Sequence, residues 1–436
     1  MDLTCQETSA SQPVKVAAAA RNELSKAADL INEGKPQKAV AVLQKLVGKN
    51  RKNIAARRCL ALAYYRGGQS ESAILELKKI IALDPNNAEH YFNSGFIYHS
   101  QGENDPAVVN YEKALALDSG NLKYKKQLGE TLFGMADSLY AARRSRLDNQ
   151  EKIIGYLEKL IRLQSDHVNG HELLGRVFED IGDVLTAQGN REAAKTNYEK
   201  SRDEYLKTVI LDPGHKASLF LAKVCLALER NDLALRYVKS YLRFNDREFT
   251  ILIGILTKLA SKDPKNIELR KLLAIAYHRS SQTELAIREY KQIMVLEPNR
   301  AENYSNLGVL YRARGLQEEA AQSFERAVEL EPSRLEYKKD LAGIYFSMAI
   351  IQYATFDRSR RSWSRMIDYL NRSIRYEPNN ASAYRLLGKV YEEIAEYWKS
   401  HSNLKKAEDY YKKAQNAYLE MRKIEEKLKA KVNPPH

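Results

Sequence analysis

The chain matches itself when it is shifted by 213 positions, and this internal repeat restricts its fold more than any other feature. The match runs without a gap from about Ile54 to Leu206, and about a third of the aligned residues are identical. The segment AENYSNLGVLY, which begins at Ala301, lies over AEHYFNSGFIY, which begins at Ala88. A self-match of this length indicates one structural array that is present twice, because periodic chains build repetitive architectures.

A shorter period of 34 residues lies inside each copy. Units of this length begin near Ile54, Ala88, Ile267 and Ala301. They share a pattern of large, small and aromatic residues that ends in a proline in the clearest cases. In the unit that begins at Ala301 the pattern consists of Tyr304, Leu307, Gly308, Tyr311, Ala320, Phe324, Ala327 and Pro332.

This pattern resembles the tetratricopeptide repeat family, and the resemblance covers nearly the whole chain after about residue 17. It implies an all-α fold, a right-handed helical superhelix (α-solenoid) of antiparallel helix pairs, tandemly duplicated with the 213-residue period. Gly308 and Ala320 are small where two helices would cross closely, and Tyr311 and Phe324 would fill the gaps beside them. Pro332 cannot continue a helix, so we expect it to end the second helix of its unit.

Some units are longer than 34 residues. The unit that begins at Leu122 runs 46 residues to Val168, and its duplicate runs from Leu335 to Ala381. The unit after Val168 is also extended, with Gly189-Asn190 as the predicted turn between its helices. About 12 extra residues shared by two helices would lengthen each by roughly 9 Å, so these hairpins should protrude.

The two copies are predicted to join at a seam. Residues 216–229 have a helical pattern without a counterpart at the start of the first copy, so we expect this helix to be unpaired and the seam to lie near residues 230–232. The predicted parts are a disordered N-terminus over residues 1–16, a first array over 17–229, a second array over 230–428 and a disordered tail over 429–436.

The sequence lacks the patterns of enzymes, membrane proteins and secreted proteins. It contains no Gly-rich phosphate loop, no nucleophile elbow, no apolar run of roughly 18 residues and no apolar secretory segment at its start. Cys5, Cys59 and Cys225 have neither metal-ligand nor redox spacing, and we interpret them as reduced thiols. His167 and His171 are spaced like a helical metal pair, but no third ligand is near. We therefore expect no enzyme, no cofactor, no bound metal and a cytoplasmic protein.

The resemblance also implies a partner-binding groove, because in this family the first helices of the units line the concave surface. Carried onto this chain, the groove has an apolar centre with basic residues on both sides. Its predicted residues are Arg58, Tyr65, Phe92, Asn93, Phe96, Lys123 and Lys126 in the first copy, and Asn306 and Lys339 in the second. Such a surface suits a peptide or helix with aromatic or aliphatic anchors and acidic character. In the alternative interpretation, Phe92 and Phe96 pack against a neighbouring helix.

The net charge of +14 is spread unevenly, since the segment from Gly34 to Ser70 has nine Lys or Arg residues and no acid. The basic patch predicted there consists of Lys35, Lys38, Lys45, Lys49, Arg51 and Lys52. Focused positive charge speeds encounters with an acidic protein. Residues 35–52 lack the interleaved aromatic side chains that stack on nucleic-acid bases.

The sequence thus predicts a non-catalytic scaffold or adaptor that docks segments of partner proteins in the grooves of two tetratricopeptide arrays. Two alternatives stay open: an RNA-binding or regulatory repeat protein that uses the basic faces, and a regulatory subunit of an enzyme complex. We expect proteins as partners, including acidic peptide segments, and expect neither nucleic acid nor a membrane span.

Overall fold

The computed structural model describes residues 14–244, 247–355 and 360–432. All secondary structure within these ranges is helical, which confirms the predicted all-α class and the tetratricopeptide-type arrangement of consecutive helices. The chain divides into two compact units, Met1–Phe244 and Asn245–His436. None of the described helices is both long enough and apolar enough to cross a membrane.

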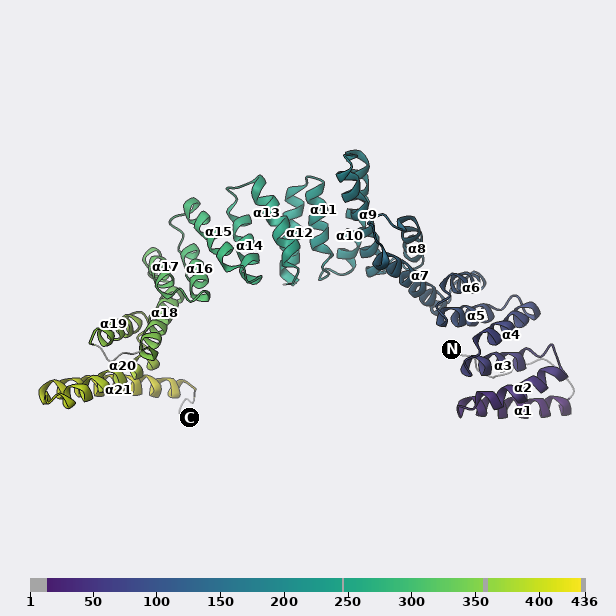
Figure 1. The fold of residues 1–436 in the computed structure, drawn as a ribbon, viewed down its shortest axis with the longest axis horizontal. Coiled ribbons are helices and arrows are strands. Elements are labelled where there is room, and N and C mark those ends of the chain that lie inside the picture. The colour runs from purple at the N-terminus through teal and green to yellow at the C-terminus, as the bar shows by residue number, and fades with distance from the viewer. Residues whose placement is uncertain (1–13, 245–246, 356–359, 433–436) are drawn as a thin grey trace. The chain divides into compact units, whose positions relative to one another are not determined.

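The first unit is a row of helices, each of which packs against the next along the chain (Figure 1). Short loops join them, so helices that are consecutive in the sequence are neighbours in space. The helices are α1 (Val14–Asn32), α2 (Pro36–Lys49), α3 (Ile54–Arg66), α4 (Ser70–Leu83), α5 (Ala88–Ser100), α6 (Asn104–Leu117), α7 (Leu122–Ala142), α8 (Gln150–Leu163), α9 (Val168–Ala187), α10 (Arg191–Leu211), α11 (Ala217–Ala227) and α12 (Asn231–Phe244).

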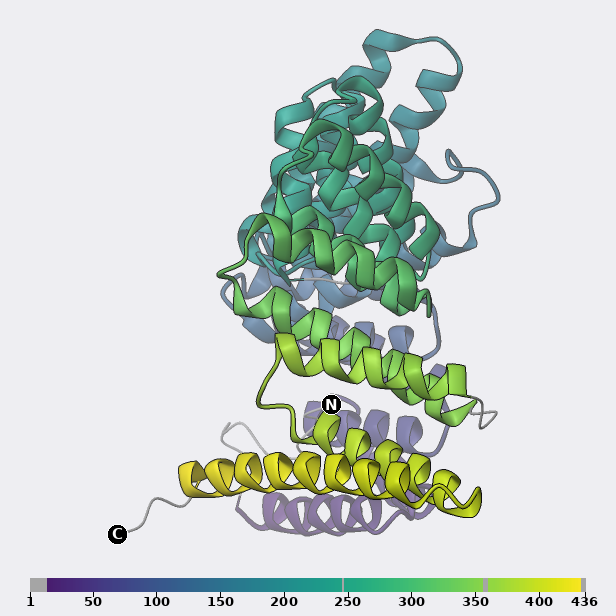
Figure 2. The same cartoon turned by 90° about the vertical axis from the view of Figure 1, so that its left-hand side faces the viewer.

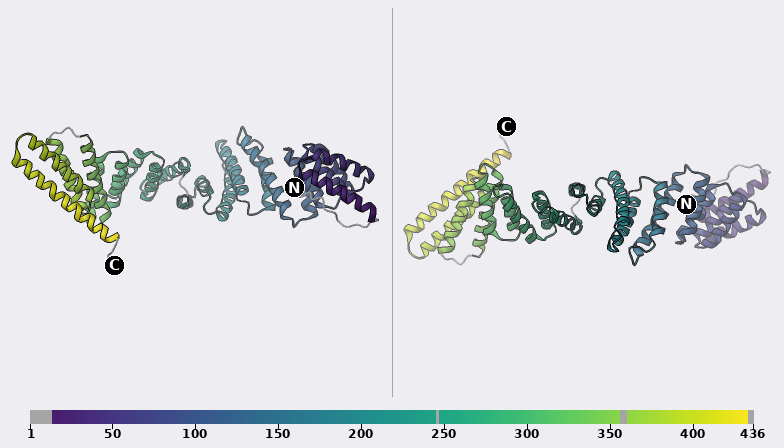
Figure 3. Two further views of the ribbon diagram at one scale, coloured as in Figure 1. Left: turned by 90° about the horizontal axis from the view of Figure 1, so that it is seen from below. Right: turned by 90° about the horizontal axis from the view of Figure 1, so that it is seen from above.

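The second unit has the same arrangement, with every helix packed against the one that follows. Its last two helices lie side by side over most of their length (Figures 2 and 3). The helices are α13 (Phe249–Lys262), α14 (Ile267–Arg279), α15 (Thr283–Leu296), α16 (Ala301–Ala313), α17 (Gln317–Leu330), α18 (Leu335–Ala354), α19 (Arg360–Tyr376), α20 (Ala381–Ser400) and α21 (Leu404–Val432).

Individual residues determine where these helices begin and end. Asn53 precedes α3, and its side-chain oxygen accepts a hydrogen bond from the Ala56 backbone N–H at 2.9 Å, which satisfies a donor that the helix leaves unpaired. The turn inside a hairpin needs a residue with positive φ. Gly102 takes this role after α5 at φ 78°, and Gly315 takes it after α16 at φ 73°, a conformation that glycine adopts without steric cost.

Each hairpin closes where a small residue of one helix meets an aromatic ring of the other. A Cβ atom at Gly308 would lie 2.9 Å from the Phe324 ring, and one at Gly95 would lie 2.8 Å from the Tyr111 ring. Both rings are fully buried, and so is Ala320, one turn before Phe324. The close crossing predicted at Gly308 and Ala320 is therefore confirmed, with Phe324 as the side chain that fills it.

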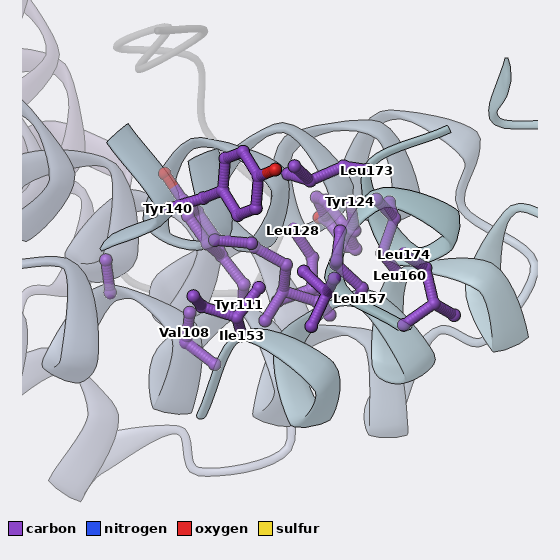
Figure 4. Packing of buried hydrophobic residues seen from close by; sticks show 14 of the residues in the cluster. Val108, Tyr111, Tyr124, Leu128, Tyr140, Ile153, Leu157, Leu160, Leu173 and Leu174 are labelled. Atoms are coloured by element: carbon purple, nitrogen blue, oxygen red, sulfur yellow. The ribbon is translucent and has the colours of Figure 1, made fainter. Parts of the chain in front are cut away.

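The core continues from one hairpin to the next. A single cluster of buried side chains extends from α5 to α9, and Tyr111, Tyr124, Leu128 and Leu157 lie together within it (Figure 4). Each of these four side chains is 7% exposed or less. At about 25 cal/mol per Å² of apolar surface removed from water, burial of this kind is the main term that stabilises the stack of helices.

Eight helices of the second unit begin 213 residues after a helix of the first. α14 begins at Ile267 and α3 at Ile54, and the same interval separates α13 from α2, α15 from α4, α16–α18 from α5–α7, and α20–α21 from α9–α10. α19 departs from the interval and begins at Arg360, next to residues 356–359, which lie outside the described ranges. The helix positions follow the interval, while the duplication of the sequence itself stays a prediction.

The α9–α10 hairpin is longer than the standard hairpins by about two turns in each helix. A Cβ atom at Gly175 would lie 2.8 Å from the Tyr205 ring, and these two residues are 30 positions apart in place of 16. The 14 additional residues add about seven to each helix, or roughly 10 Å. Further out, Gly182 meets the Tyr198 ring in the same way, at 2.7 Å. The far end of this hairpin extends beyond the ends of α11 and α12, as the predicted protrusion requires (Figure 1).

The helix that was expected to be unpaired has a partner. α11 packs against α12, and Glu229 takes the left-handed conformation between them at φ 60°, as Gly102 does between α5 and α6. The two helices form a complete hairpin in the first unit, so the expectation of an unpaired helix is wrong. The seam predicted near residues 230–232 falls in the turn of this hairpin, whereas the two compact units divide between Phe244 and Asn245.

The ends of the chain contain more helix than expected. α1 begins at Val14 and α21 continues to Val432, so part of each segment that was predicted to be disordered is helical. The remainder of these segments, residues 1–13 and 433–436, lies outside the described ranges.

The three cysteines do not share one state. Cys225 is a free thiol without exposed surface, and burial raises its pKa to about 11. Cys59 is disulfide-bonded, which contradicts the interpretation of reduced thiols, and Cys5 lies outside the described ranges. The cysteines therefore do not argue for a reducing compartment.

Candidate functional site

The groove residues predicted for the first copy lie on α3, α5 and α7, the first helices of three successive hairpins. Arg58 of α3 forms an ion pair with Glu89 of α5 at 3.5 Å, and its side chain is 16% exposed. Tyr65 of α3 meets Phe96 of α5 edge to face, with 6.0 Å between the ring centroids. Arg58, Tyr65 and Phe96 are all half-buried, so each keeps part of its side chain accessible along the junction of the two helices.

Phe92 and Asn93 belong to the core. Phe92 is 3% exposed, stacks on Tyr124 with 4.7 Å between centroids, and packs against Tyr111 at 5.5 Å. Asn93 is 2% exposed, and its Nδ2 is buried without a hydrogen-bond partner among the described residues. A partner segment cannot reach either side chain, so their assignment to the groove is wrong. The alternative interpretation holds for Phe92, which packs against the neighbouring helices.

Two exposed lysines of α7 lie next to these residues. The Nζ of Lys123 lies over the Phe92 ring, 4.9 Å from its centroid. Lys126 is paired with Glu130 at 3.8 Å, and the two side chains are 77% and 54% exposed. An ion pair this exposed contributes little to stability, and a partner can replace it at low cost. We call the accessible set the first-helix surface, which consists of Arg58, Tyr65, Phe96, Lys123 and Lys126.

The matched positions of the second unit have different chemistry. Asn306 is half-buried on α16, and Lys339 is exposed on α18. Ser305 and Val309 stand where the first unit has Phe92 and Phe96. Phe92 and Phe96 therefore have no aromatic equivalent at these positions of the second unit.

All six residues of the predicted basic patch are exposed, on α2 and on the loops at its two ends. Two of them are paired with acids that precede the acid-free segment: Lys35 with Glu33 at 2.8 Å, and Lys49 with Glu23 at 3.3 Å. The rest of the positive charge comes from Lys38, Lys45, Arg51 and Lys52.

His167 and His171 have structural partners. His167 precedes α9, and its Nδ1 accepts a hydrogen bond from the Gly170 backbone N–H at 2.9 Å. His171 is 2% exposed, with its Nδ1 2.6 Å from a carboxylate oxygen of Glu204 and its Nε2 3.0 Å from the carbonyl oxygen of Ser165. In the part of the chain that the structure describes, no three His, Cys, Asp or Glu residues are placed to hold a metal ion.

The elongated hairpins contain a set of hydrogen bonds that the motif patterns did not indicate. In the first unit three tyrosine hydroxyls donate to three carboxylates of α9, namely Tyr140 to Asp180 at 2.9 Å, Tyr198 to Asp183 at 2.8 Å and Tyr205 to Glu179 at 2.7 Å. In the second unit the residues 213 positions later pair in the same way, namely Tyr353 to Glu393 at 2.5 Å, Tyr418 to Glu392 at 2.8 Å and Tyr411 to Glu396. We call these six pairs the tyrosine–carboxylate ladder. The signal for it was the recurrence of both residue types at the 213-residue interval.

Basic side chains cover the ladder in the first unit. Arg146 is paired with Asp183 at 2.7 Å, from the loop after α7. Lys223 of α11 is paired with Glu179, and its Nζ also lies 3.4 Å from Asp183. Burial opposes the charged form of Asp183, but the hydrogen bond from Tyr198 and the charge of Lys223 outweigh burial and lower the pKa of this carboxyl.

Sequence models of one repeat family match segments in both units. A model described as TPR repeat matches residues 61–102, and a model described as Tetratricopeptide repeat matches residues 88–121 and 301–334. The latter two segments hold the α5–α6 and α16–α17 hairpins, with their buried glycine–aromatic crossings. No curated protein sequence matches the chain.

Several solved structures are similar to the chain at low identity. The crystal structure of MamA is 21% identical and has a TM-score of 0.26, with 42% of this chain and 96% of that chain covered. The C-terminal part of a TPR repeat-containing protein from Cytophaga hutchinsonii is 19% identical over 64% of this chain and 97% of that chain, with a TM-score of 0.31. Yeast Tom70 is 12% identical over 96% and 98% of the two chains, with a TM-score of 0.26. At these values the assignment rests on the repeat models and on the residue pattern of the hairpins. On those two grounds, the chain contains tetratricopeptide repeats in both units.

Proposed function

We propose that the chain is a non-catalytic scaffold whose first unit docks an acidic peptide or helical segment of a partner protein on the first-helix surface. The observation that carries this proposal is the half-buried pair of Tyr65 and Phe96, flanked by Arg58, Lys123 and Lys126. Aromatic rings that are accessible on one side offer a large contact area with few torsions to order. The basic side chains attract an acidic segment and fix its position along the rings.

The surface is held in place before a partner binds. Arg58 is held by its ion pair with Glu89, and the Tyr65 and Phe96 rings restrict each other through their edge-to-face contact. Few side-chain torsions therefore need to be ordered on docking, and less of the interaction energy is lost to entropy.

The second unit enters the proposal as a separate docking surface. Its Asn306 and Lys339 lie at positions matched to Asn93 and Lys126, but His278 and Val309 stand where the first unit has Tyr65 and Phe96. We therefore expect it to take a different segment from the one held by the first unit.

A regulatory subunit of an enzyme complex would use the same surfaces, and enzymatic activity that co-purifies with the intact chain would distinguish that role.

The test uses a library of displayed peptides in which acidic content and aromatic content vary independently. The intact chain should enrich peptides that carry both an acidic run and an aromatic or aliphatic anchor. In a Lys126→Glu variant we expect the affinity for the enriched peptides to fall about tenfold, which corresponds to about 1.4 kcal/mol.

Lys339→Glu is the matched control, because Lys339 stands 213 residues after Lys126 and is also exposed. It should leave the same peptides bound. If both variants bind these peptides as tightly as the intact chain does, the first-helix surface is not the docking site.

A further inference from the structure

One face of the α9–α10 hairpin is covered in the first unit, and the matched face of α20–α21 is open in the second. α11 is what covers it in the first unit. Phe220 of α11 stacks on Tyr205 of α10, with 5.7 Å between centroids, and Lys223 reaches Glu179 and Asp183 of α9. Tyr205 is fully buried as a result, and the Glu179 side chain is 10% exposed.

The residues of the second unit that match this face are accessible. Tyr418 stands in the place of Tyr205 and is half-buried, although it keeps its ladder hydrogen bond to Glu392 at 2.8 Å. Glu392, which matches Glu179, is exposed. The side chain of Glu396 is 62% exposed, against 25% for the matched Asp183.

The second unit does not supply the cation that the ladder receives from α11 in the first. Glu392 forms no ion pair with a described residue, and Glu396 has a contact with Lys399 at 3.8 Å on its own helix. Among the residues that the structure describes, none comes from a helix that follows α21, which with α20 forms the last pair of helices in Figure 2. Two carboxylates and a tyrosine ring thus remain in the arrangement that holds Phe220 and Lys223 in the first unit.

One position reverses the charge at the edge of this face. The carboxylate of Glu172 on α9 lies 3.5 Å from Nε2 of His215 and 3.8 Å from Nζ of Lys216, in the segment that leads into α11. The matched residue of α20 is Arg385, whose side chain is 62% exposed and paired with Glu425 at 2.5 Å. A helix on the open face would therefore meet a positive charge near its start, where α11 meets a negative one.

We propose that the face formed by Glu392, Glu396 and Tyr418 docks an amphipathic helix of a partner protein that resembles α11. Such a helix has an aromatic residue to stack on Tyr418 and a lysine three residues later to pair with Glu392 and Glu396. Near its N-terminus it carries an acidic or neutral residue where α11 is preceded by His215 and Lys216. The argument is charge complementarity together with the helix that the chain itself places on the matched face.

The probe is a fluorescent peptide of residues 215–229, which contains α11, measured by anisotropy against the full chain. A version with His215→Glu and Lys216→Glu should bind several-fold more tightly, because it suits Arg385. Lys223→Glu in either peptide should weaken binding at least tenfold. Glu392→Lys in the chain should weaken binding of the peptide that keeps Lys223 to the same extent. It should also restore binding of the Lys223→Glu peptide.

Glu408→Lys is the matched control, since Glu408 is an exposed acid of α21, 72% accessible and paired only within its own helix with Lys412. Its binding of the peptides should equal that of the intact chain. Failure of all peptides to bind overturns the proposal, and so does binding that Glu392→Lys leaves unchanged, which would place the peptide elsewhere, for example at the site of α11. Sedimentation of the chain alone tests whether a second copy of the chain binds this face. A self-association that Glu392→Lys abolishes would assign the face to a second copy and would overturn the proposal of a partner helix.

Discussion

At the residue scale, the hairpins depend on glycines that lie against aromatic rings. A Cβ atom at Gly95 would be 2.8 Å from the buried ring of Tyr111, closer than side-chain atoms pack. Gly134, in contrast, lies within α7, and apart from its chain neighbours and the nearby backbone of its own helix no atom lies within 4 Å of the corresponding position. The same substitution at these two helical glycines should therefore change stability in opposite directions.

We expect Gly95→Ala to lower the free energy of unfolding by about 1–3 kcal/mol, because the added methyl group displaces the Tyr111 ring from a well-packed core. Gly134→Ala should raise it by about 0.5–1 kcal/mol, because alanine loses less backbone entropy in a helix. Urea denaturation followed by circular dichroism measures both. Equal effects of the two variants, in either direction, would contradict this account of the crossing.

The burial of Phe92 shows where prediction from the sequence fails at this scale. Its place in the repeat predicts a groove residue, as do the places of Tyr65 and Phe96, whose side chains are half-buried. The difference comes from Tyr124 of the next hairpin, whose ring covers Phe92 at 4.7 Å. A contact between residues 32 positions apart depends on how neighbouring hairpins pack, and the repeat pattern contains no information about it.

At the scale of the helices, the two units use different residues at the same helix starts. Asn87 and Asn121 cap α5 and α7 with hydrogen bonds from their side chains to backbone N–H groups. The matched residues before α16 and α18 are Arg300 and Arg334, whose side chains form no capping hydrogen bond. The exposed ion pairs of these arginines contribute little, so α16 and α18 lack the stabilisation that a side-chain cap gives.

Arg300→Asn should therefore stabilise the second unit by about 1 kcal/mol, since an asparagine at this position accepts a backbone hydrogen bond. The reverse change, Asn87→Arg, should destabilise the first unit by a similar amount. The midpoint of urea unfolding, monitored by hydrogen exchange in each unit, separates the two effects. An Arg300→Asn variant with unchanged protection in α16 would show that the cap is not what limits this helix.

The helix boundaries that the sequence predicted best are those that residues of the repeat pattern mark directly. The starts of α5, α7, α9, α16, α18 and α20 agree with the predicted unit boundaries, and Pro332 follows the end of α17 as expected. The pairing of α11 was missed because Glu229, in place of the usual glycine, takes the left-handed turn before α12. The tyrosine–carboxylate ladder was missed because its residues are ordinary surface types, and only their common register makes them partners.

At the scale of the whole molecule, both units rely on buried tyrosines. The chain has 27 tyrosines, and burial raises the pKa of Tyr140 in the first unit to about 12 and that of Tyr290 in the second to about 12. The pKa of an unfolded tyrosine is about 10. Folding therefore favours the protonated hydroxyl at both sites, and the two units share this dependence on pH.

This stabilisation should be fully present below about pH 10 and decline as the pH rises through about 12, because the folded state holds protons that the unfolded state releases. Urea midpoints between about pH 9 and about pH 11, together with the ultraviolet absorbance of tyrosinate, measure the decline. A double variant, Tyr140→Phe with Tyr290→Phe, should flatten the dependence. If every tyrosine ionised near pH 10 while the protein stayed folded, burial would not be the cause of these shifts.

The glycine–aromatic contacts of the α9–α10 hairpin also determine which insertions can lengthen its helices. Seven residues make nearly two full turns, so a helix lengthened by seven returns its side chains to within about 20° of their former direction. Gly182 consequently repeats the contact of Gly175, and Tyr198 repeats that of Tyr205. An insertion of five residues per helix would instead rotate the rings away from their glycines. For this hairpin, insertions or deletions of about seven residues in each helix should therefore preserve the glycine–aromatic crossings, whereas changes of five in each helix should lower the urea midpoint.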